Sequence, residues 1–285
     1  VTIDKTAPTG IITLDEKGWD KFLEFITFGW YKVDDLAATV TAEDASGIAG
    51  IEYVITESAY ASATELEAAG LTWESYSENR KPTLKENQNQ IIYVRITDMA
   101  GNISYISSDG IHVDTLAPAV SVAVDTTSVT ASGFTFTITS NEVGKYDYAV
   151  VKATDPVPTA EDLLTGNVPG GIVGSGNISA EQVGQPIALT ASGLEANTAY
   201  TVYAVAQDTV IRLSDGRAAP NVSAVTSSGL IVTAQFGLDK TQVTVEDMLY
   251  TGSAVEPGVE VSYGGTVLTE GQDYQVVYHD NVEAS

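Results

Sequence analysis

The chain has 285 residues, of which 44% are hydrophobic and 18% charged, a composition that suits several folded modules and excludes a disordered chain. Its 13 basic and 38 acidic side chains give a net charge of −25, which excludes nucleic acid as an expected partner because both would be strongly negative. The chain contains no cysteine, which excludes disulfides and favours a cytosolic or bacterial exported protein over a eukaryotic extracellular receptor.

The sequence also lacks the features of a membrane-inserted or signal-bearing segment. It has no run of about 18 apolar residues, and its first residues do not form a charged region followed by an apolar one. We therefore expect no membrane insertion within these residues, and any signal or anchor to lie outside them.

A short motif opens the chain and occurs again at residues 111–118. Each copy is an alternating strand, then Asp4 or Asp114, then two residues and Ala-Pro. The separation of the two copies along the sequence is too long for a solenoid repeat and suits separate domains in a row. We predict a tail of a preceding repeat or linker at 1–8, and modules at 9–116, 117–236 and 237–285.

The first module alternates apolar and polar residues in several short segments, which predicts half-buried β-strands. A capping-box spacing starts at Ser62 and a glycine follows at Gly70, so we expect a short helix near 62–70. A second short helix is expected earlier, because apolar residues recur there at helical spacing. The two patterns consist of Ile51, Tyr53, Ile55, Ile92, Val94 and Ile96 for the strands, and Trp19, Phe22, Leu23 and Ile26 for the earlier helix.

The second module repeats this plan. Phe134, Phe136 and Ile138 alternate with threonines, and the alternation returns after Tyr200. A helical excursion is predicted near 159–166, again after a tyrosine-containing strand. The glycine-rich residues 170–176 lack a following helix and are interpreted as a flexible loop. Many short strands with glycine turns predict all-β sandwiches arranged in tandem.

The first module resembles the bacterial Ig-like repeats of Gram-positive surface proteins. The resemblance rests on residues 18–23, 26–29, 43–48 and 96–104 and covers nearly all of 9–116. It implies an Ig-like β-sandwich.

The second module resembles a bacterial fibronectin type III-like domain, on residues 158–164 and 193–208. The resemblance places Tyr200 as a corner tyrosine, whose hydroxyl would reach back to the backbone. The sequence departs from the usual pattern after Asp208, where Thr-Val-Ile replaces Ala-Gly-Asn, so we expect a longer or differently shaped hairpin there.

Residues 249–257, 268–274 and 277–281 resemble another small β-module that is repeated in Firmicutes surface proteins. Such modules usually run to about 80 residues or more, within the lower range of domain sizes. We therefore expect a truncated third module that lacks its terminal strands, exposes an unpaired edge and is more mobile than the first two.

The sequence offers no catalytic constellation. The two histidines, His112 and His279, fall in different modules, and there is no cysteine nucleophile, phosphate-binding loop or zinc-binding helix motif. Close acidic pairs could serve glycoside hydrolysis, but 38 acidic residues will produce such pairs by chance. We expect no enzymatic activity, no cofactor and no catalytic residue.

Aspartates recur at the module junctions and at strand ends. Carboxylates with backbone oxygens are what Ca²⁺ prefers, but no Asp-x-Asp-x-Asp loop is present. The favoured interpretation is that Asp44 and Asp98 cap turns by accepting backbone N–H hydrogen bonds, and no metal ligand is assigned. The recurring aspartates are Asp4, Asp44, Asp98, Asp114 and Asp208.

All three tryptophans fall in the first module. Exposed aromatic rings can stack on sugars or anchor a protein partner. Core packing is the interpretation for Trp19 and is also favoured for Trp30 and Trp73, although either of the latter could be exposed. Exposed coplanar rings of Trp30 and Trp73 would favour glycan binding.

Three function classes remain. The leading one is a non-catalytic structural or adhesive stalk segment of a bacterial cell-surface or secreted protein, located outside the cell or in the cell wall. Pro118 in the linker would stiffen such a stalk. The second is a set of spacer or carbohydrate-binding modules within a secreted carbohydrate-active enzyme. The third is direct binding of a host or extracellular glycan or protein by these modules.

Overall fold

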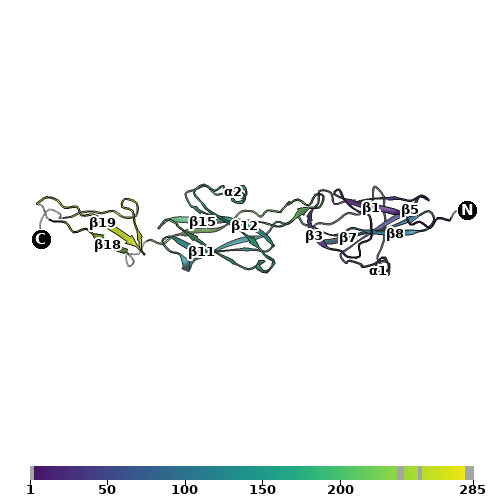
Figure 1. Cartoon of the computed structure of the whole chain (residues 1–285), viewed down its shortest axis with the longest axis horizontal. Coiled ribbons are helices and arrows are strands. Elements are labelled where there is room, and N and C mark those ends of the chain that lie inside the picture. The colour runs from purple at the N-terminus through teal and green to yellow at the C-terminus, as the bar shows by residue number, and fades with distance from the viewer. Residues whose placement is uncertain (1–2, 236–240, 250–251, 280–285) are drawn as a thin grey trace.

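The computed structural model describes residues 3–235, 241–249 and 252–279. Three β-modules follow one another in a row, with the two termini at opposite ends (Figure 1). We name them the first module (β1 to β9), the second module (β10 to β17) and the third module (β18 to β20). No helix in the described part of the chain has the length and apolar character needed to cross a membrane.

The first module is built from two sheets. The smaller sheet has the strand order β2-β1-β4, and the larger has the order β3-β9-β7-β5-β6 with β8 also paired to β7. Its core lies between them and includes Ile12, Trp19 and Ile96. The strands are β1 Thr9–Leu14, β2 Lys17–Trp19, β3 Phe28–Lys32, β4 Thr39–Glu43, β5 Ile48–Thr56, β6 Glu74–Ser75, β7 Asn89–Asp98, β8 Ile103–Ser107 and β9 Gly110–Val113.

The predicted helix near 62–70 is present as α1 (Ala63–Ala68). Ser62 is its N-cap, and the Ser62 hydroxyl accepts the Glu65 N–H at 3.2 Å. Leu66 of α1 packs with Ile91 and Tyr93 on the face of β7 that points away from the main core. The strand is therefore buried on both faces, so the half-buried strand predicted at residues 92–96 is wrong in that respect, because α1 covers the second face.

The predicted helix containing Phe22 and Ile26 is not formed. Trp19 ends β2, and residues 20–27 run as an irregular connection to β3. The backbone of this connection bonds to the strand region around β8 instead of to itself: Leu23 N–H donates to Ser107 Oγ at 2.9 Å, and Ser107 N–H donates to the Lys21 carbonyl at 3.0 Å. Tertiary hydrogen bonds thus override the helical periodicity, while Trp19 is buried in the core as expected.

The second module has a sheet of order β10-β11-β14 facing a sheet of order β13-β12-β15-β17. Phe134, Phe136 and Ile138 are buried between them, as the alternation predicts. The elements are β10 Val120–Asp125, η1 Thr126–Ser128, β11 Gly133–Ser140, β12 Gly144–Lys152, β13 Ile172–Ile178, η2 Ala180–Gln182, β14 Ile187–Ser192, β15 Ala199–Gln207, β16 Ile211–Arg212 and β17 Thr226–Val232.

Helix α2 (Ala160–Thr165) confirms the second predicted excursion and begins with a capping box between Thr159 and Asp162. Its Leu163 packs with Val151 and Val205 on the outer face of β12 and β15. As in the first module, a short helix after a central strand covers the outer face of the longer sheet. Both modules therefore have a partial third layer that strand alternation alone does not reveal.

Residues 170–176 correct another expectation. Most of them form β13, an edge strand paired with β12 over its whole length, and not a flexible loop. A side chain at Gly174 or Gly176 would collide with the rings of Tyr148 or Tyr146, which lie across the strand. These glycines thus allow tyrosine rings to lie directly over the backbone, which is a recognised reason for glycine inside a strand.

Tyr200 confirms the predicted corner tyrosine. It is buried in the core of the second module, and its hydroxyl accepts the Glu195 N–H at 3.0 Å. The bond ties the start of β15 to the turn that precedes it.

The third module contributes one antiparallel sheet of order β18-β19-β20, formed by β18 Thr241–Val245, β19 Val259–Tyr263 and β20 Thr266–Val267. Two tyrosine hydroxyls tie the following residues to it: Tyr274 donates to the Val259 carbonyl at 2.8 Å and Tyr278 to the Pro257 carbonyl at 2.6 Å. Residues 250–251 and 280–281, which belong to the predicted third-module motif, lie outside the described residues.

Candidate functional site

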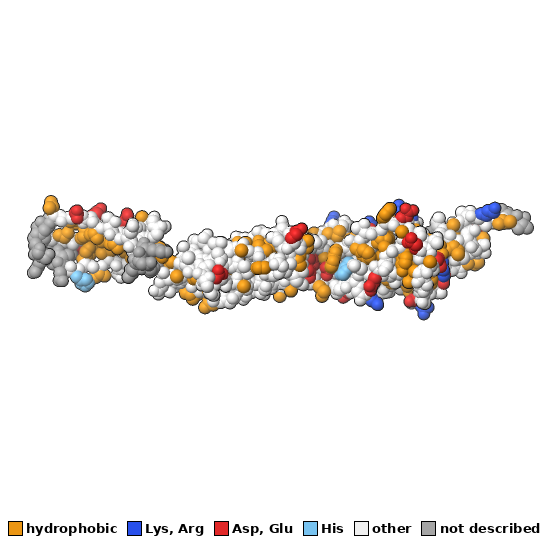
Figure 2. Space-filling view, turned by 90° about the horizontal axis from the view of Figure 1, so that it is seen from below, with side chains coloured by type: hydrophobic (Ala, Val, Ile, Leu, Met, Phe, Trp, Pro, Cys, Tyr) orange, Lys and Arg blue, Asp and Glu red, His pale blue; other side chains and the backbone are white. Residues whose placement is uncertain are grey.

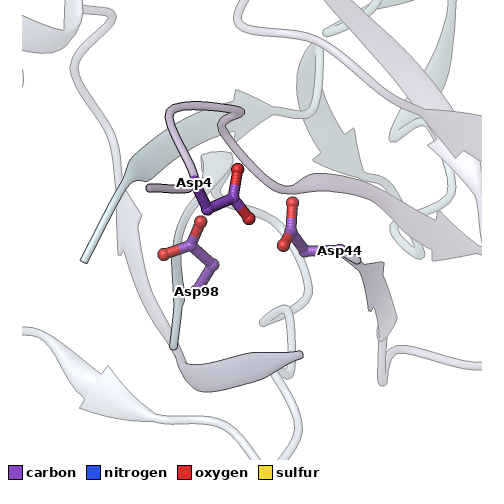
Figure 3. Close-up of side chains that lie close together, drawn as sticks. All are labelled: Asp4, Asp44 and Asp98. Atoms are coloured by element: carbon purple, nitrogen blue, oxygen red, sulfur yellow. The ribbon is translucent and has the colours of Figure 1, made fainter. Parts of the chain in front are cut away.

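The structure brings acidic side chains together at the start of each of the first two modules. Asp4, Asp44 and Asp98 form the first acidic cluster, in which the three carboxylates face one another (Figure 3). Asp114, Glu142 and Asp208 form the second acidic cluster, at the boundary between the first and second modules. Figure 2 shows acidic side chains gathered at that boundary. In each cluster, one carboxylate oxygen from each of the three residues lies within 4.8 Å of the other two.

The two clusters occupy equivalent places in the two modules. One acid comes from the linker that enters the module, at Asp4 or Asp114. A second comes from the loop between two core strands, at Asp44 before β5 or Glu142 before β12. The third lies at the end of the long central strand, at Asp98 on β7 or Asp208 just after β15. Five of these six residues stand out in the sequence as aspartates at strand ends and module junctions, whereas Glu142 does not, because a glutamate in a loop resembles any solvated acid.

Hydrogen bonds fix the first acidic cluster. Asp98 Oδ1 accepts the N–H groups of Ala100 and Asn102, both at 2.8 Å, and its Oδ2 accepts the Asn102 side-chain amide at 2.7 Å. Asp44 Oδ1 accepts the Ser46 N–H at 2.7 Å, and Asp4 Oδ1 accepts the Thr6 N–H at 2.9 Å. The turn-capping role expected for Asp44 and Asp98 is therefore visible in their bonds.

The second acidic cluster repeats these bonds. Asp208 Oδ1 accepts the N–H groups of Val210 and Asn221 at 3.0 and 2.9 Å, and its Oδ2 accepts the Asn221 side-chain amide at 2.8 Å. Asp114 Oδ1 accepts the Leu116 N–H at 3.0 Å. Both Asp114 and Asp208 are buried, at 5% and 8% exposure.

An asparagine links each cluster to its linker. Besides binding Asp98, the Asn102 amide donates to the Thr6 carbonyl at 2.9 Å; the Asn221 amide, besides binding Asp208, donates to the Asp114 carbonyl at 3.2 Å. Asn102 belongs to the Ala-Gly-Asn motif, and the sequence indicates that this asparagine is missing after Asp208. The structure shows that Asn221 takes its place after a longer loop, which confirms the predicted longer hairpin.

The electrostatics of the two clusters differ. Burial acts to raise the pKa of Asp98, but the hydrogen bonds from Asn102 and Ala100 outweigh it and hold that pKa below its ordinary value. Burial, together with the charges of Asp114 and Asp208, raises the pKa of Glu142. Among the described residues, no hydrogen bond or ion pair reaches the Glu142 carboxylate. Carboxylate oxygens at this spacing are the ligands that hard cations such as Ca²⁺ prefer. Turn capping, however, accounts for the positions of the aspartates without a bound ion.

The loop that carries Asn221 extends onto the first module. Its strand β16 pairs in parallel with β3, with Ile211 opposite Tyr31 and Arg212 opposite Lys32. The Lys32 ammonium donates to the Asn221 side-chain oxygen at 3.3 Å. The second acidic cluster therefore sits inside a structured contact between two modules.

Trp30 and Trp73 lie in different environments, and neither is buried in the core as Trp19 is. Trp30 is 55% exposed, contrary to the favoured core interpretation, and its ring lies against the His112 ring, with centroids 4.0 Å apart and planes tilted by 32°. It lines a cavity of about 420 Å³ with Asp114, Glu142 and Asp208. Trp73 is half-buried, with the Arg95 guanidinium 4.6 Å from its ring centroid. The two rings pack against different partners and do not form a shared platform.

The histidines are not brought together. His112 Nδ1 lies 2.8 Å from Asn89 Oδ1, beside Trp30 in the first module, whereas His279 is exposed after the third module's sheet. The arrangement pairs neither histidine with a nucleophile, so the expectation of no catalytic residue stays a prediction.

No protein-family model matches the sequence, and no curated protein matches it. Among solved structures, the chain is similar to domains A168–A170 of titin at 10% identity, over 79% of this chain and 66% of that one, with a TM-score of 0.42. It is similar to the FN1–FN3 domains of chicken CNTN1 at 14% identity, over 72% and 64%, with a TM-score of 0.28. It also resembles latent PorU from Porphyromonas gingivalis at 15% identity, over 80% and 20%, with a TM-score of 0.25.

The chain thus spans just under two thirds of the titin and CNTN1 fragments and a fifth of PorU. The chain's own strand orders and burial place it in the all-β class, and its first two modules are two-sheet β-sandwiches that follow one another in an extended row, as predicted.

Proposed function

We propose that the chain is a non-catalytic stalk segment of a bacterial surface or secreted protein. The observation that carries this proposal is the junction between the first two modules, where the linker, the second acidic cluster and β16 connect one module to the next. A chain of flexibly tethered binding domains needs no such contact, whereas a segment that holds other domains at a distance benefits from it.

The cellular setting is part of the same proposal. The resemblance to repeats of Gram-positive, Firmicutes-type surface proteins supports an extracellular or cell-wall location. The absence of cysteine and the net charge of −25 are consistent with an exported bacterial protein that does not bind nucleic acid. An adhesive role would add a glycan or protein ligand to the spacer role.

One observation favours an alternative, in which the modules are accessory parts of a secreted carbohydrate-active enzyme. Trp30 is exposed, and acidic side chains line the same cavity. An aromatic ring beside carboxylates can stack on a sugar while the carboxylates accept its hydroxyl hydrogens. The half-buried Trp73, which lies elsewhere, offers a control for this idea.

The test is a binding screen of the chain against glycans and extracellular-matrix proteins, combined with small-angle X-ray scattering. The stalk proposal predicts an elongated particle and no ligand tighter than about 100 µM. A ligand with a low-micromolar Kd that W30A abolishes and W73A leaves intact would replace the spacer role with glycan or protein recognition. A compact particle with the modules folded back on one another would contradict the stalk.

A further inference from the structure

We propose that residues 209–220 of the second module form a latch loop that completes the first module. By this proposal, the first module reaches its full stability, and its orientation relative to the second, only when the latch loop is docked. The inference goes beyond the stalk proposal, since it concerns how two modules fold as one unit whatever the chain carries or binds.

The latch loop covers an open edge of the first module. In the larger sheet of that module, β3 has β9 on one side, and within the described part of the chain β16 alone pairs with its other side. Besides the β16 pairing, the Leu213 N–H donates to the Lys32 carbonyl at 3.1 Å. Unpaired strand edges expose backbone groups and invite unwanted pairing, so the second module supplies the edge protection that the first module lacks.

The latch loop also supplies a core side chain. Leu213 is 6% exposed and belongs to the same buried cluster as Trp19, Ile111 and Val113 of the first module. Removing a buried leucine from a packed core leaves a cavity as well as losing the transfer free energy of its methyl groups. A residue of the second module is therefore part of the hydrophobic core of the first.

The latch loop also has hydrogen bonds of its own, in addition to its contacts with the first module. It folds back on itself as a small hairpin: Arg212 N–H donates to the Arg217 carbonyl at 2.8 Å, and Ala219 N–H donates to the Val210 carbonyl at 2.9 Å. Gly216 takes a φ of +69° at the turn, a conformation that glycine adopts without strain. A loop that is held by its own hydrogen bonds loses less conformational entropy on docking than a loop without them.

The first module shows what the same position looks like without a latch. There Asp98 is followed by Met-Ala-Gly and then Asn102, and the Asp–Asn contact closes over this short turn. In the second module the same contact, between Asp208 and Asn221, closes over the latch loop. The Asp–Asn contact is thus independent of the loop length, so the latch can be removed without removing the contact.

The experiment uses the tryptophans as a reporter, because all three lie in the first module while the substitutions lie in the second. We expect L213A to shift the urea midpoint of the tryptophan fluorescence transition of the full chain downward by about 1 M or more. The matched control L230A changes a leucine of β17 that is 65% exposed and should leave this midpoint unchanged.

A second variant replaces residues 209–220 with the Met-Ala-Gly turn of the first module. We expect the same downward shift in the tryptophan transition, with hydrogen-exchange protection of β12 and β15 retained. Because the chain has no cysteine, spin labels at E57C and E161C report the distance between the modules, and the distribution should broaden in this variant. A tryptophan midpoint that is unchanged in L213A, or lowered equally by L230A, would overturn the proposal.

Discussion

The carboxylate of Glu142 is predicted to destabilise the junction whenever it is charged and no cation is present. It lies with Asp114 and Asp208 in the second acidic cluster, and its pKa is raised by burial and by those two charges. A raised pKa means that the folded chain binds this proton more tightly than the unfolded chain does. The penalty is therefore present above the folded pKa and is relieved as the pH falls toward the ordinary glutamate value.

The size of the effect follows from the spacing. Two unit charges 4.8 Å apart repel by about 0.9 kcal/mol in water, and by several times more in a protein interior. Glu142 has two such neighbours but is only half-buried, so solvent screening offsets part of the repulsion. We expect E142Q to raise the free energy of unfolding by about 1 kcal/mol at pH 7.

The assay is urea unfolding of the full chain in low salt with a chelator, at pH values from 4 to 8. E142Q should exceed the wild type at pH 7, and the difference should shrink toward pH 4 and in 1 M NaCl, where charges are screened. The control E57Q changes an exposed glutamate after β5 and should have no effect. If E142Q were neutral or destabilising in chelator at every pH, the repulsion argument would be refuted.

The same samples test the turn-capping interpretation of the acidic clusters. Capping predicts equal midpoints for the wild type in chelator and in millimolar Ca²⁺, because nothing binds only to the folded state. A rise in Ca²⁺ that E142Q removes would instead identify the second acidic cluster as a cation site.

Substitutions at three further places test other parts of the structure. N221A removes the amide that joins Asp208 to the linker and should lower the free energy of unfolding by about 1–3 kcal/mol, measured by urea unfolding, with N102A acting in the same direction in the first module. Y200F removes the hydroxyl that accepts the Glu195 N–H and should cost about 1 kcal/mol with no change in far-UV circular dichroism. G174A places a methyl group against the Tyr148 ring and should lower the Tm. In the control G50A the added methyl group meets no atom within 4 Å, so the Tm should be unchanged or higher. Equal effects of the two substitutions would contradict the packing role of Gly174.

Local pattern was enough for much of this architecture. The alternation in residues 134–138 and the caps at Ser62 and Thr159 depend on neighbours within a few positions, and each is found as predicted. The corner tyrosine at Tyr200, which the resemblance to fibronectin type III-like domains implies, is also found. The repeated motif around Asp4 and Asp114 also indicated where linkers enter modules. Such signals survive in a single sequence because the physical constraint acts over one strand or one turn.

Tertiary structure decided the features that join distant segments. Residues 20–27 have helical periodicity, but their backbone forms hydrogen bonds to the region of β8. The glycines of β13 predict a loop from the sequence alone, and only the structure shows that they make room for the tyrosine rings across the strand. Leu213 follows Val210 and Ile211 in a short apolar stretch that has no pattern to indicate which core it enters, yet it lies in the core of the preceding module. Each acidic cluster likewise combines residues that are separated by up to about 100 positions in the sequence, so only the fold sets the distance between their charges. Local preference encodes which elements form, whereas side-chain partners depend on chain folding that no short window contains.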